Sequence, residues 1–178
     1  MRKVIVMMSV SLDGYAATED GELSWMFPGI DDEAQEWMTA LMRRARTQLL
    51  GRVAYDAQSR AWPGSTGETA DLVNGATKIV FSRTLTSVDW QGARLAELDP
   101  AGEIARLRDE PGDDVVVTGV ASFARGLSSA GLVDEYRLIV HPVVLGRGLP
   151  LFGDLLELKL VDSTAFATGA MGQVYTPV

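Results

Sequence analysis

Three segments of the sequence combine glycine, arginine or hydroxyl residues directly after an apolar run. They are Leu49–Arg52, Val80–Arg83 and Val116–Ser122. Glycine lets the backbone approach a phosphate closely, and arginine holds phosphate oxygens with two parallel donors. A helix N-terminus offers free N–H groups to the same kind of anion. The segments therefore predict phosphate binding, although each alone also fits a tight turn, a helix cap or a solvated surface charge.

Missing residue types exclude several other kinds of chemistry. The chain has no cysteine, which rules out disulfides, thiolate nucleophiles and zinc–thiolate sites. Its single histidine, His141, supports neither a Ser-His-Asp or Cys-His system nor a histidine-rich metal site. We therefore read His141 as structural and expect no metal. The G-x-x-x-x-G-K-S/T phosphate loop and a G-x-G-x-x-G pattern after the first strand are also missing, so a common kinase or ATPase is not expected.

Length, composition and charge limit the partners. The 178 residues are 47% hydrophobic and 22% charged, which is typical of one globular domain spanning residues 1–178. The net charge of -8 argues against non-specific binding to nucleic acid or to an anionic membrane, but not against a small anionic ligand. No segment approaches the roughly 20 apolar residues that span a bilayer. We expect a cytoplasmic protein with a small-molecule substrate.

Strands and helices must bring the three segments together. Apolar runs predict strands at residues 3–9, 47–51, 78–82, 114–119, 135–145, 158–167 and 173–178. Helical patterns lie at residues 31–44, 52–60, 68–74, 100–110 and 121–130. This alternation predicts an α/β sheet that is mostly parallel, with an antiparallel C-terminal edge where no helix separates the last strands. Such sheets bind ligands beyond the carboxyl ends of their strands, where all three segments lie.

Taken in order, these elements resemble the dihydrofolate reductase superfamily, and most closely the C-terminal reductase domain of the bifunctional riboflavin-biosynthesis deaminase-reductases and its stand-alone relatives. The resemblance rests on S-L-D-G (Ser11–Gly14), L-L-G-R-V-A-Y-D (Leu49–Asp56), I-V-F-S-R (Ile79–Arg83) and the block Thr118–Phe152, with its G-L-V-D-E and P-V-V-L-G-x-G-x-x-L-F portions. It covers nearly the whole chain. It implies a three-layer fold with a central mixed sheet flanked by helices, commonly in a homodimer.

The resemblance also implies bound NADPH and hydride transfer from its nicotinamide to a carbonyl or C=N group. Gly51 and Arg52 would face the cofactor's phosphates. Ser82 and Arg83 would hold the adenosine 2′-phosphate, which favours NADPH over NADH.

Two further parts of the cofactor site are implied in the same way. Ala16 and Ala17 would lie beside the nicotinamide, and a helix N-terminus would receive the pyrophosphate. The residues at that N-terminus are Gly119, Val120, Ala121 and Ser122. Many relatives have Gly-Gly or Gly-Ser where this chain has Gly119-Val120. A β-branched residue restricts the backbone, so this turn is the point at which the sequence departs from the family pattern.

A carboxylate is the candidate on the substrate side. In dihydrofolate reductases, an acidic residue at the start of the first helix follows a W-x-x-P segment and binds the pterin. Here W-M-F-P-G-I-D-D (Trp25–Asp32) offers Asp31 or Asp32, offset by one residue. Either carboxylate could bond an amidine-like substrate edge and assist protonation. Either could equally be a helix N-terminal acid that only complements the helix dipole.

Different roles are predicted for successive parts of the loop after the first strand. Asp13-Gly14 forms the turn, with Asp13 bonding local backbone. Tyr15–Ala17 then forms a pocket wall, and Glu19–Gly21 a polar flap over the site. For a homodimer, the segments 135–145 and 146–152 are apolar enough to form an interface, but they fit a core equally well.

Three functions remain open. The first is an NADPH-dependent reductase of a small heterocycle, with a pterin-, flavin- or pyrimidine-like substrate. The second is a non-catalytic nucleotide-binding or regulatory module on the same fold, which the altered Gly119-Val120 turn would favour. The third is the riboflavin-pathway 5-amino-6-(5-phosphoribosylamino)uracil reductase, which would need a separate deaminase.

Overall fold

The computed structural model describes all residues from Met1 to Val178. Its strands are β1 (Val4–Ser11), β2 (Tyr15–Ala17), β3 (Thr47–Gly51), β4 (Thr77–Phe81), β5 (Ala93–Leu95), β6 (Val115–Val117), β7 (Glu135–His141), β8 (Leu149–Pro150), β9 (Leu158–Ala165) and β10 (Met171–Pro177). Its helices are α1 (Asp32–Arg44), α2 (Arg52–Ala61), α3 (Glu68–Gly75), α4 (Pro100–Asp109), α5 (Ala121–Ser129) and a short 3-10 helix, η1 (Ser24–Gly29). None of these helices has the length and apolar character needed to cross a membrane.

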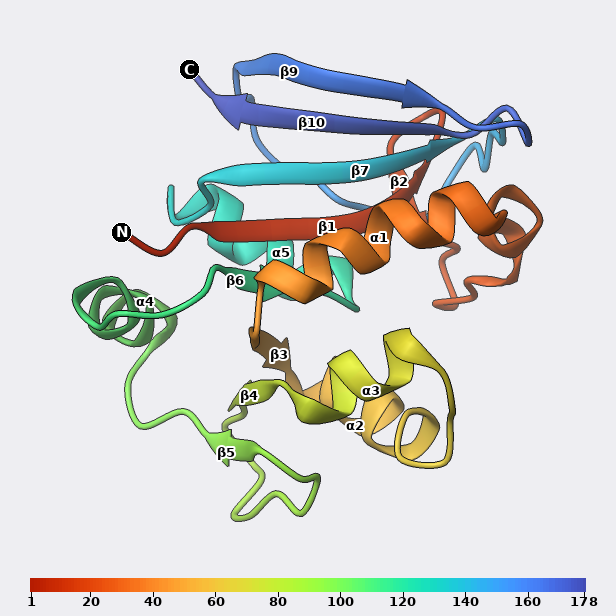
Figure 1. The fold of residues 1–178 in the computed structure, drawn as a ribbon. Helices are drawn as coiled ribbons and strands as arrows, with labels where there is room; N and C mark the ends of the chain where they lie inside the picture. Colours follow the sequence, from red (N-terminus) through yellow and green to blue (C-terminus); the bar gives the residue numbers. More distant parts are fainter.

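Eight strands form the central sheet, in the order β5-β4-β3-β6-β1-β7-β10-β9. The strands from β5 to β7 in that order are parallel, whereas β10 is antiparallel to both β7 and β9. Figure 1 shows β1 inside the sheet, with β7, β10 and β9 on one side and the other strands on the opposite side. The predicted mixed, mostly parallel sheet with an antiparallel C-terminal edge is confirmed.

Helices cover both faces of this sheet because successive strand residues point to opposite sides. Val4 and Val6 of β1 belong to the larger core, which also contains buried residues of α4 and α5. Ile5, between them, packs with Leu41 and Met42 of α1. Buried residues of α2 and α3 join a third cluster with β3 and β4. The result is the three-layer arrangement that the family resemblance implied.

The largest error in the predicted elements is the strand at residues 135–145, which ends at His141. Pro142 follows, and proline has no N–H with which to continue the ladder. The chain instead leaves the sheet in a turn that brings the carbonyl of Val143 to the N–H of Leu12, at 2.8 Å. The short strands β2, β5 and β8 were not predicted because two or three residues are too few to show a periodic pattern.

Candidate functional site

The carboxyl ends of β3, β4 and β6 lie side by side and bring the three candidate segments to one edge. Gly51 of β3 is in register with Phe81 of β4, and Leu49 of β3 is in register with Val117 of β6. Gly51 and Arg52 therefore lie beside Ser82 on one side and the start of α5 on the other. The spacing is tight, because a Cβ on Gly51 would be 3.2 Å from the Cβ of Phe123 in α5.

Arg52, Ser82 and Arg83 form a polar corner on this edge. The Arg52 guanidinium donates to the Thr84 hydroxyl and, at 3.4 Å, to the Asp56 carboxylate one turn along α2. The Ser82 hydroxyl accepts from the backbone N–H groups of Thr84 and Leu85, at 3.2 and 3.0 Å. Arg83 is exposed and forms no ion pair. Thr84 was missed from the sequence, because only the fold shows that Arg52 reaches it.

The turn before α5 is shaped by Gly119. Its φ is +100°, and a Cβ there would lie 2.6 Å from the Cβ of Ala54, so any other residue is both strained and crowded. Val120 takes φ -91° and ψ 130°, an extended conformation that β-branched residues favour. The departure from Gly-Gly or Gly-Ser is therefore accommodated without strain.

The N-terminus of α5 is open. Val120 is its N-cap, and no side chain accepts a hydrogen bond from the first turn, which contains Ala121 and Ser122. The first N–H groups of a helix have no intrahelical acceptor, and no acidic residue occupies this turn. This N-terminus has the free donors and the positive dipole end that an anion binds.

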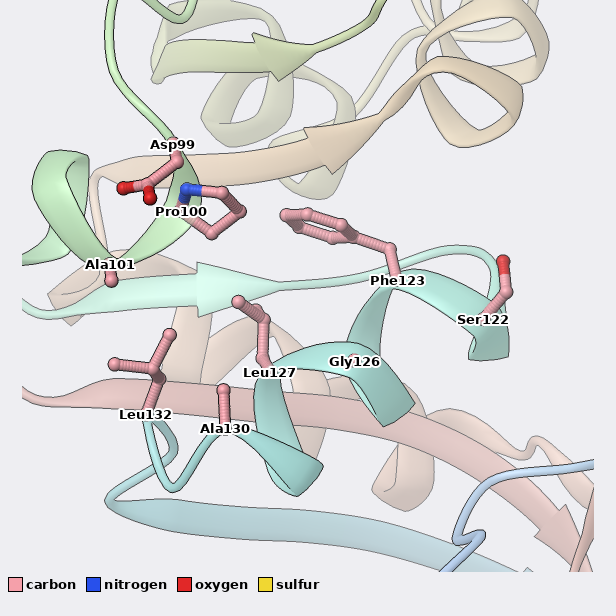
Figure 2. A pocket seen from close by; sticks show the side chains of 9 residues that line it. All are labelled: Asp99, Pro100, Ala101, Ser122, Phe123, Gly126, Leu127, Ala130 and Leu132. Carbon is pink, nitrogen blue, oxygen red and sulfur yellow. The ribbon is translucent and has the colours of Figure 1, made fainter.

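A cavity of about 350 Å³ lies next to this N-terminus, between α4 and α5. Figure 2 shows Phe123 of α5 reaching toward Pro100 at the start of α4, with Leu127 one turn further along α5. The Phe123 ring also packs against Phe81 of β4, with ring centroids 5.2 Å apart. The lining of the cavity is largely apolar, which suits a flat aromatic ligand. Sequence reasoning did not find this cavity.

Ala16 and Ala17 are buried in β2, which follows the end of β1. Ala17 pairs with Leu149 of β8, and a Cβ on Gly148 would lie 2.2 Å from the Ala17 carbonyl oxygen. Ala16 belongs to the larger core. The two alanines are thus part of a small second sheet, and Ala16 packs in the same core as Ala121 at the start of α5.

Asp13 joins two of the sequence blocks that carried the family resemblance. Its carboxylate accepts hydrogen bonds from the N–H groups of Leu145 and Gly146, at 3.1 and 2.7 Å, and from the Ser11 hydroxyl at 2.6 Å. These hydrogen bonds lower the pKa of Asp13, and the bond from Ser11 contributes most to the shift. The expectation that Asp13 bonds local backbone is corrected, because both backbone partners lie more than 130 residues away. Asp13 binds the loop that follows β7.

Asp31 and Asp32 stand at the start of α1, as expected. Asp31 is the N-cap, and its Oδ1 accepts from the Ala34 N–H at 2.9 Å. Its second oxygen, Oδ2, accepts no hydrogen bond from the protein. Asp32 is the first helical residue, in the turn where acids favour the helix dipole. The capping role of Asp31 leaves one of its oxygens for a ligand.

His141 is the last residue of β7, at the same edge of the sheet. The ring is 1% exposed, its Nε2 is 3.0 Å from the Ser9 hydroxyl, and Trp25 of η1 packs edge-on at 5.4 Å. Burial lowers the pKa of His141, which favours the neutral imidazole. No group of three or more acidic or histidine side chains in this edge, or elsewhere, is placed to hold a metal.

Comparisons with known proteins identify the family and the fold. The family model of the RibD C-terminal domain matches residues 2–171. The chain is 33% identical to the Bacillus subtilis (strain 168) protein YyaP over 182 residues, which cover 98% of this chain and 94% of YyaP.

Solved structures give the same result. A putative riboflavin biosynthesis protein from Shewanella sp. PV-4 is 26% identical, with TM-score 0.78 and 99% of both chains covered. The Thermotoga maritima diaminohydroxyphosphoribosylaminopyrimidine deaminase/5-amino-6-(5-phosphoribosylamino)uracil reductase is 16% identical, with TM-score 0.71 over 99% of this chain and 57% of that one. Enterococcus faecalis dihydrofolate reductase, solved with NADP(H), is 13% identical, with TM-score 0.65 over 98% and 96%. The chain therefore belongs to the RibD C-terminal domain family, with the dihydrofolate-reductase-like fold and a reductase-like domain of the riboflavin-pathway type.

Proposed function

We propose that this protein is an NADPH-dependent reductase that transfers a hydride to a C=N or C=O group of a small heterocyclic substrate. The observation that carries the proposal is the convergence of an open helix N-terminus, a glycine turn with positive φ and two arginines at the ends of three adjacent parallel strands. The first acceptor to test is 5-amino-6-(5-phosphoribosylamino)uracil, which the name of the Thermotoga relative specifies for that protein.

The residues at this edge fit NADPH group by group. The N-terminus of α5, from Gly119 to Ser122, suits the pyrophosphate, because Gly119 has no Cβ to obstruct it. Arg52, Ser82 and Arg83 suit the 2′-phosphate, since Arg83 has no protein partner to release and Arg52 lies beside it. The apolar wall formed by Phe123 and Pro100 in the cavity of Figure 2 suits the adenine ring.

Bound NADPH would supply a hydride to the carbon of the C=N or C=O group, and the nitrogen or oxygen would take its proton from solvent water. On the protein side, Asp31 is held in place by its cap bond to Ala34. Its free Oδ2 points to a role in accepting an N–H of the substrate, as a fixed acceptor near the start of α1. Most of the remaining rate enhancement in such chemistry comes from positioning donor and acceptor.

The first experiment tests whether the protein binds NADPH, through the stabilisation that a bound nucleotide gives. At NADPH concentrations of 100 times Kd, we expect the free energy of unfolding to rise by about 2.7 kcal/mol, read as an increase in Tm. Arg83→Gln should weaken NADPH binding by roughly 10-fold or more and leave NADH binding nearly unchanged, because only NADPH carries the 2′-phosphate. Gly119→Ala should weaken both nucleotides.

Arg60→Gln is the matched control, since Arg60 is an exposed arginine at the opposite end of α2. This variant should bind NADPH like the unsubstituted protein. A Tm that NADPH leaves unchanged would contradict the proposal. Stabilisation by NADPH without oxidation of NADPH by the pyrimidine or by pterin and flavin acceptors would instead identify a non-catalytic nucleotide-binding module.

A further inference from the structure

The single histidine has one ring nitrogen without a partner. His141 is buried, and while Nε2 meets the Ser9 hydroxyl, Nδ1 has no hydrogen-bond partner within the protein. An unpaired buried polar group costs about 1–3 kcal/mol, so such groups are rare in native proteins and call for an explanation. A purely structural histidine would be expected to pair both nitrogens.

The unpaired nitrogen faces η1. A Cβ on Gly29 would lie 2.3 Å from Nδ1 and 3.0 Å from Cε1, so glycine is the residue that lets η1 pass over the ring. Trp25, from the same short helix, covers the ring edge-on. Nδ1 is thus separated from the surface by Gly29 and by its neighbours in η1, which include the exposed Phe27.

Few hydrogen bonds hold η1 over the imidazole ring. The hydrogen bond that joins η1 to a distant part of the chain runs from the Thr168 hydroxyl to the Gly29 carbonyl, at 3.0 Å. The N-cap position, Leu23, makes no side-chain cap bond. A six-residue helix with one such tertiary hydrogen bond costs little to displace compared with an element of the central sheet.

His141 also lies at the edge of the sheet where the carboxyl ends of the parallel strands meet. It ends β7, beside β1, and β6 separates β1 from the phosphate-binding end of β3. The chain passes from Gly29 through Ile30 directly to Asp31, whose free oxygen stands at the start of α1. Ser9 and His141 thus come from neighbouring strands, and Asp31 follows η1, the short helix that covers the ring.

We infer that Nδ1 of His141 is a substrate-binding atom, which hydrogen-bonds the ring N–H or C=O edge of a planar pyrimidine-type heterocycle when η1 moves aside. The inference rests on the proposed function and names the substrate class of that site. A neutral imidazole suits both partners, because the Ser9 hydroxyl can donate to Nε2 or accept from it. Nδ1 is then a donor to a C=O in the first arrangement and an acceptor from an N–H in the second.

A pair of amide variants separates this role from a structural one. Asn at position 141 keeps a polar atom near the place of Nδ1, whereas Gln reaches the place of Nε2 and its bond to Ser9. We expect His141→Gln to raise KM for 5-amino-6-(5-phosphoribosylamino)uracil by about 10-fold or more, with NADPH binding unchanged, and His141→Asn to stay closer to the unsubstituted protein. If Ser9 pairing and packing were the only role, the order of the two variants would be reversed, and that order would overturn the inference.

The second measurement needs no variant. Because His141 is the sole histidine, the ¹⁵N spectrum of the imidazole contains one Nδ1 and one Nε2 signal. Adding the same pyrimidine, without NADPH, should shift the Nδ1 signal more than the Nε2 signal. Turnover of the pyrimidine with no change at Nδ1 overturns the inference and leaves the proposed function standing. A shift at Nδ1 without NADPH oxidation supports the binding role and removes the reductase function, and the absence of both effects overturns both.

Discussion

Glu103 of α4 is a buried carboxylate that binds Arg94 of β5 and Arg106 of α4. Its carboxylate, 0% exposed, accepts from Arg94 at 2.8 and 3.0 Å, from Arg106 at 2.6 Å and from the N–H of Glu97 at 2.8 Å. These bonds, first of all that of Arg94, lower the pKa of Glu103 to about 2. The same contacts hold the segment before Pro100, which forms one wall of the cavity in Figure 2.

Because the pKa of Glu103 is lower in the folded protein than its ordinary value of 4.5, its contribution to stability is complete above pH 4.5 and is lost as the pH falls toward 2. We expect Glu103→Gln to lower the free energy of unfolding at pH 7 by about 2–3 kcal/mol, since it leaves two arginines without their shared partner. Chemical denaturation from pH 7 to pH 2 should show a smaller loss for the variant than for the unsubstituted protein.

Glu97→Gln is the control for this prediction. Glu97 also binds Arg106, at 2.9 Å, but its side chain is 71% exposed. Exposed ion pairs contribute little, so we expect a change of less than about 1 kcal/mol. Equal effects of the two substitutions at pH 7 would show that burial of Glu103 carries no special stability.

At the scale of elements, the loop between β7 and β8 is positioned by a side chain from the other end of the sequence. Asp13 binds the N–H groups of Leu145 and Gly146, and β2 pairs with β8 just beyond. Two turns that follow neighbouring parallel strands are thereby joined into one layer over the carboxyl edge.

Asp13→Ala should release this loop without unfolding the sheet. We expect hydrogen exchange at the amides of Leu145 and Gly146 to become at least about 10-fold faster at pH 7, because a charged acceptor is lost from both. Asp20→Ala serves as a comparison, since Asp20 binds the neighbouring Thr18 hydroxyl. Exchange at these two amides that is the same in Asp13→Ala and Asp20→Ala would contradict the assignment.

At the scale of the whole molecule, the homodimer that the family resemblance implies requires an interface between two copies of the chain. The strand part of the predicted interface, Glu135–His141, lies inside the sheet, and both of its edges are already paired with β1 and β10. The edge strand β9 is different, since its outer side has no strand partner and it exposes Leu160 and Val161. Unpaired edge strands readily pair with another chain.

We expect light scattering to give a mass of twice 19.2 kDa for the protein in solution. Val161→Lys, at a residue that is 58% exposed, should give the monomer, because a charge on an edge strand opposes pairing. Val144→Lys, in the exposed loop after β7, should leave the mass of the dimer unchanged. A monomeric mass before any substitution would exclude the dimer.

Several features could be predicted from the sequence because they depend on neighbouring residues. The apolar runs that became β1, β3 and β4, the amphipathic stripe of α1 and the glycine turn before α5 are all local patterns. Parallel strands place their carboxyl ends at one edge, so the sequence predicted that Gly51, Arg52, Ser82, Arg83 and Gly119 lie along the same edge. Only the structure shows that β4, β3 and β6 are neighbours there. The binding roles of these residues remain predictions.

By itself, then, the sequence determined the alternation of strands and helices, the glycine, arginine and hydroxyl residues at three strand ends, and the exclusion of thiolate and histidine-rich sites. Tertiary structure alone decided that Asp13 holds Leu145 and Gly146, that Arg52 reaches Thr84 and that Gly29 lies against Nδ1 of His141. The physical reason is distance along the chain. Backbone propensity is set within a few residues, whereas burial and the pairing of polar groups depend on which distant segments the sheet order places side by side.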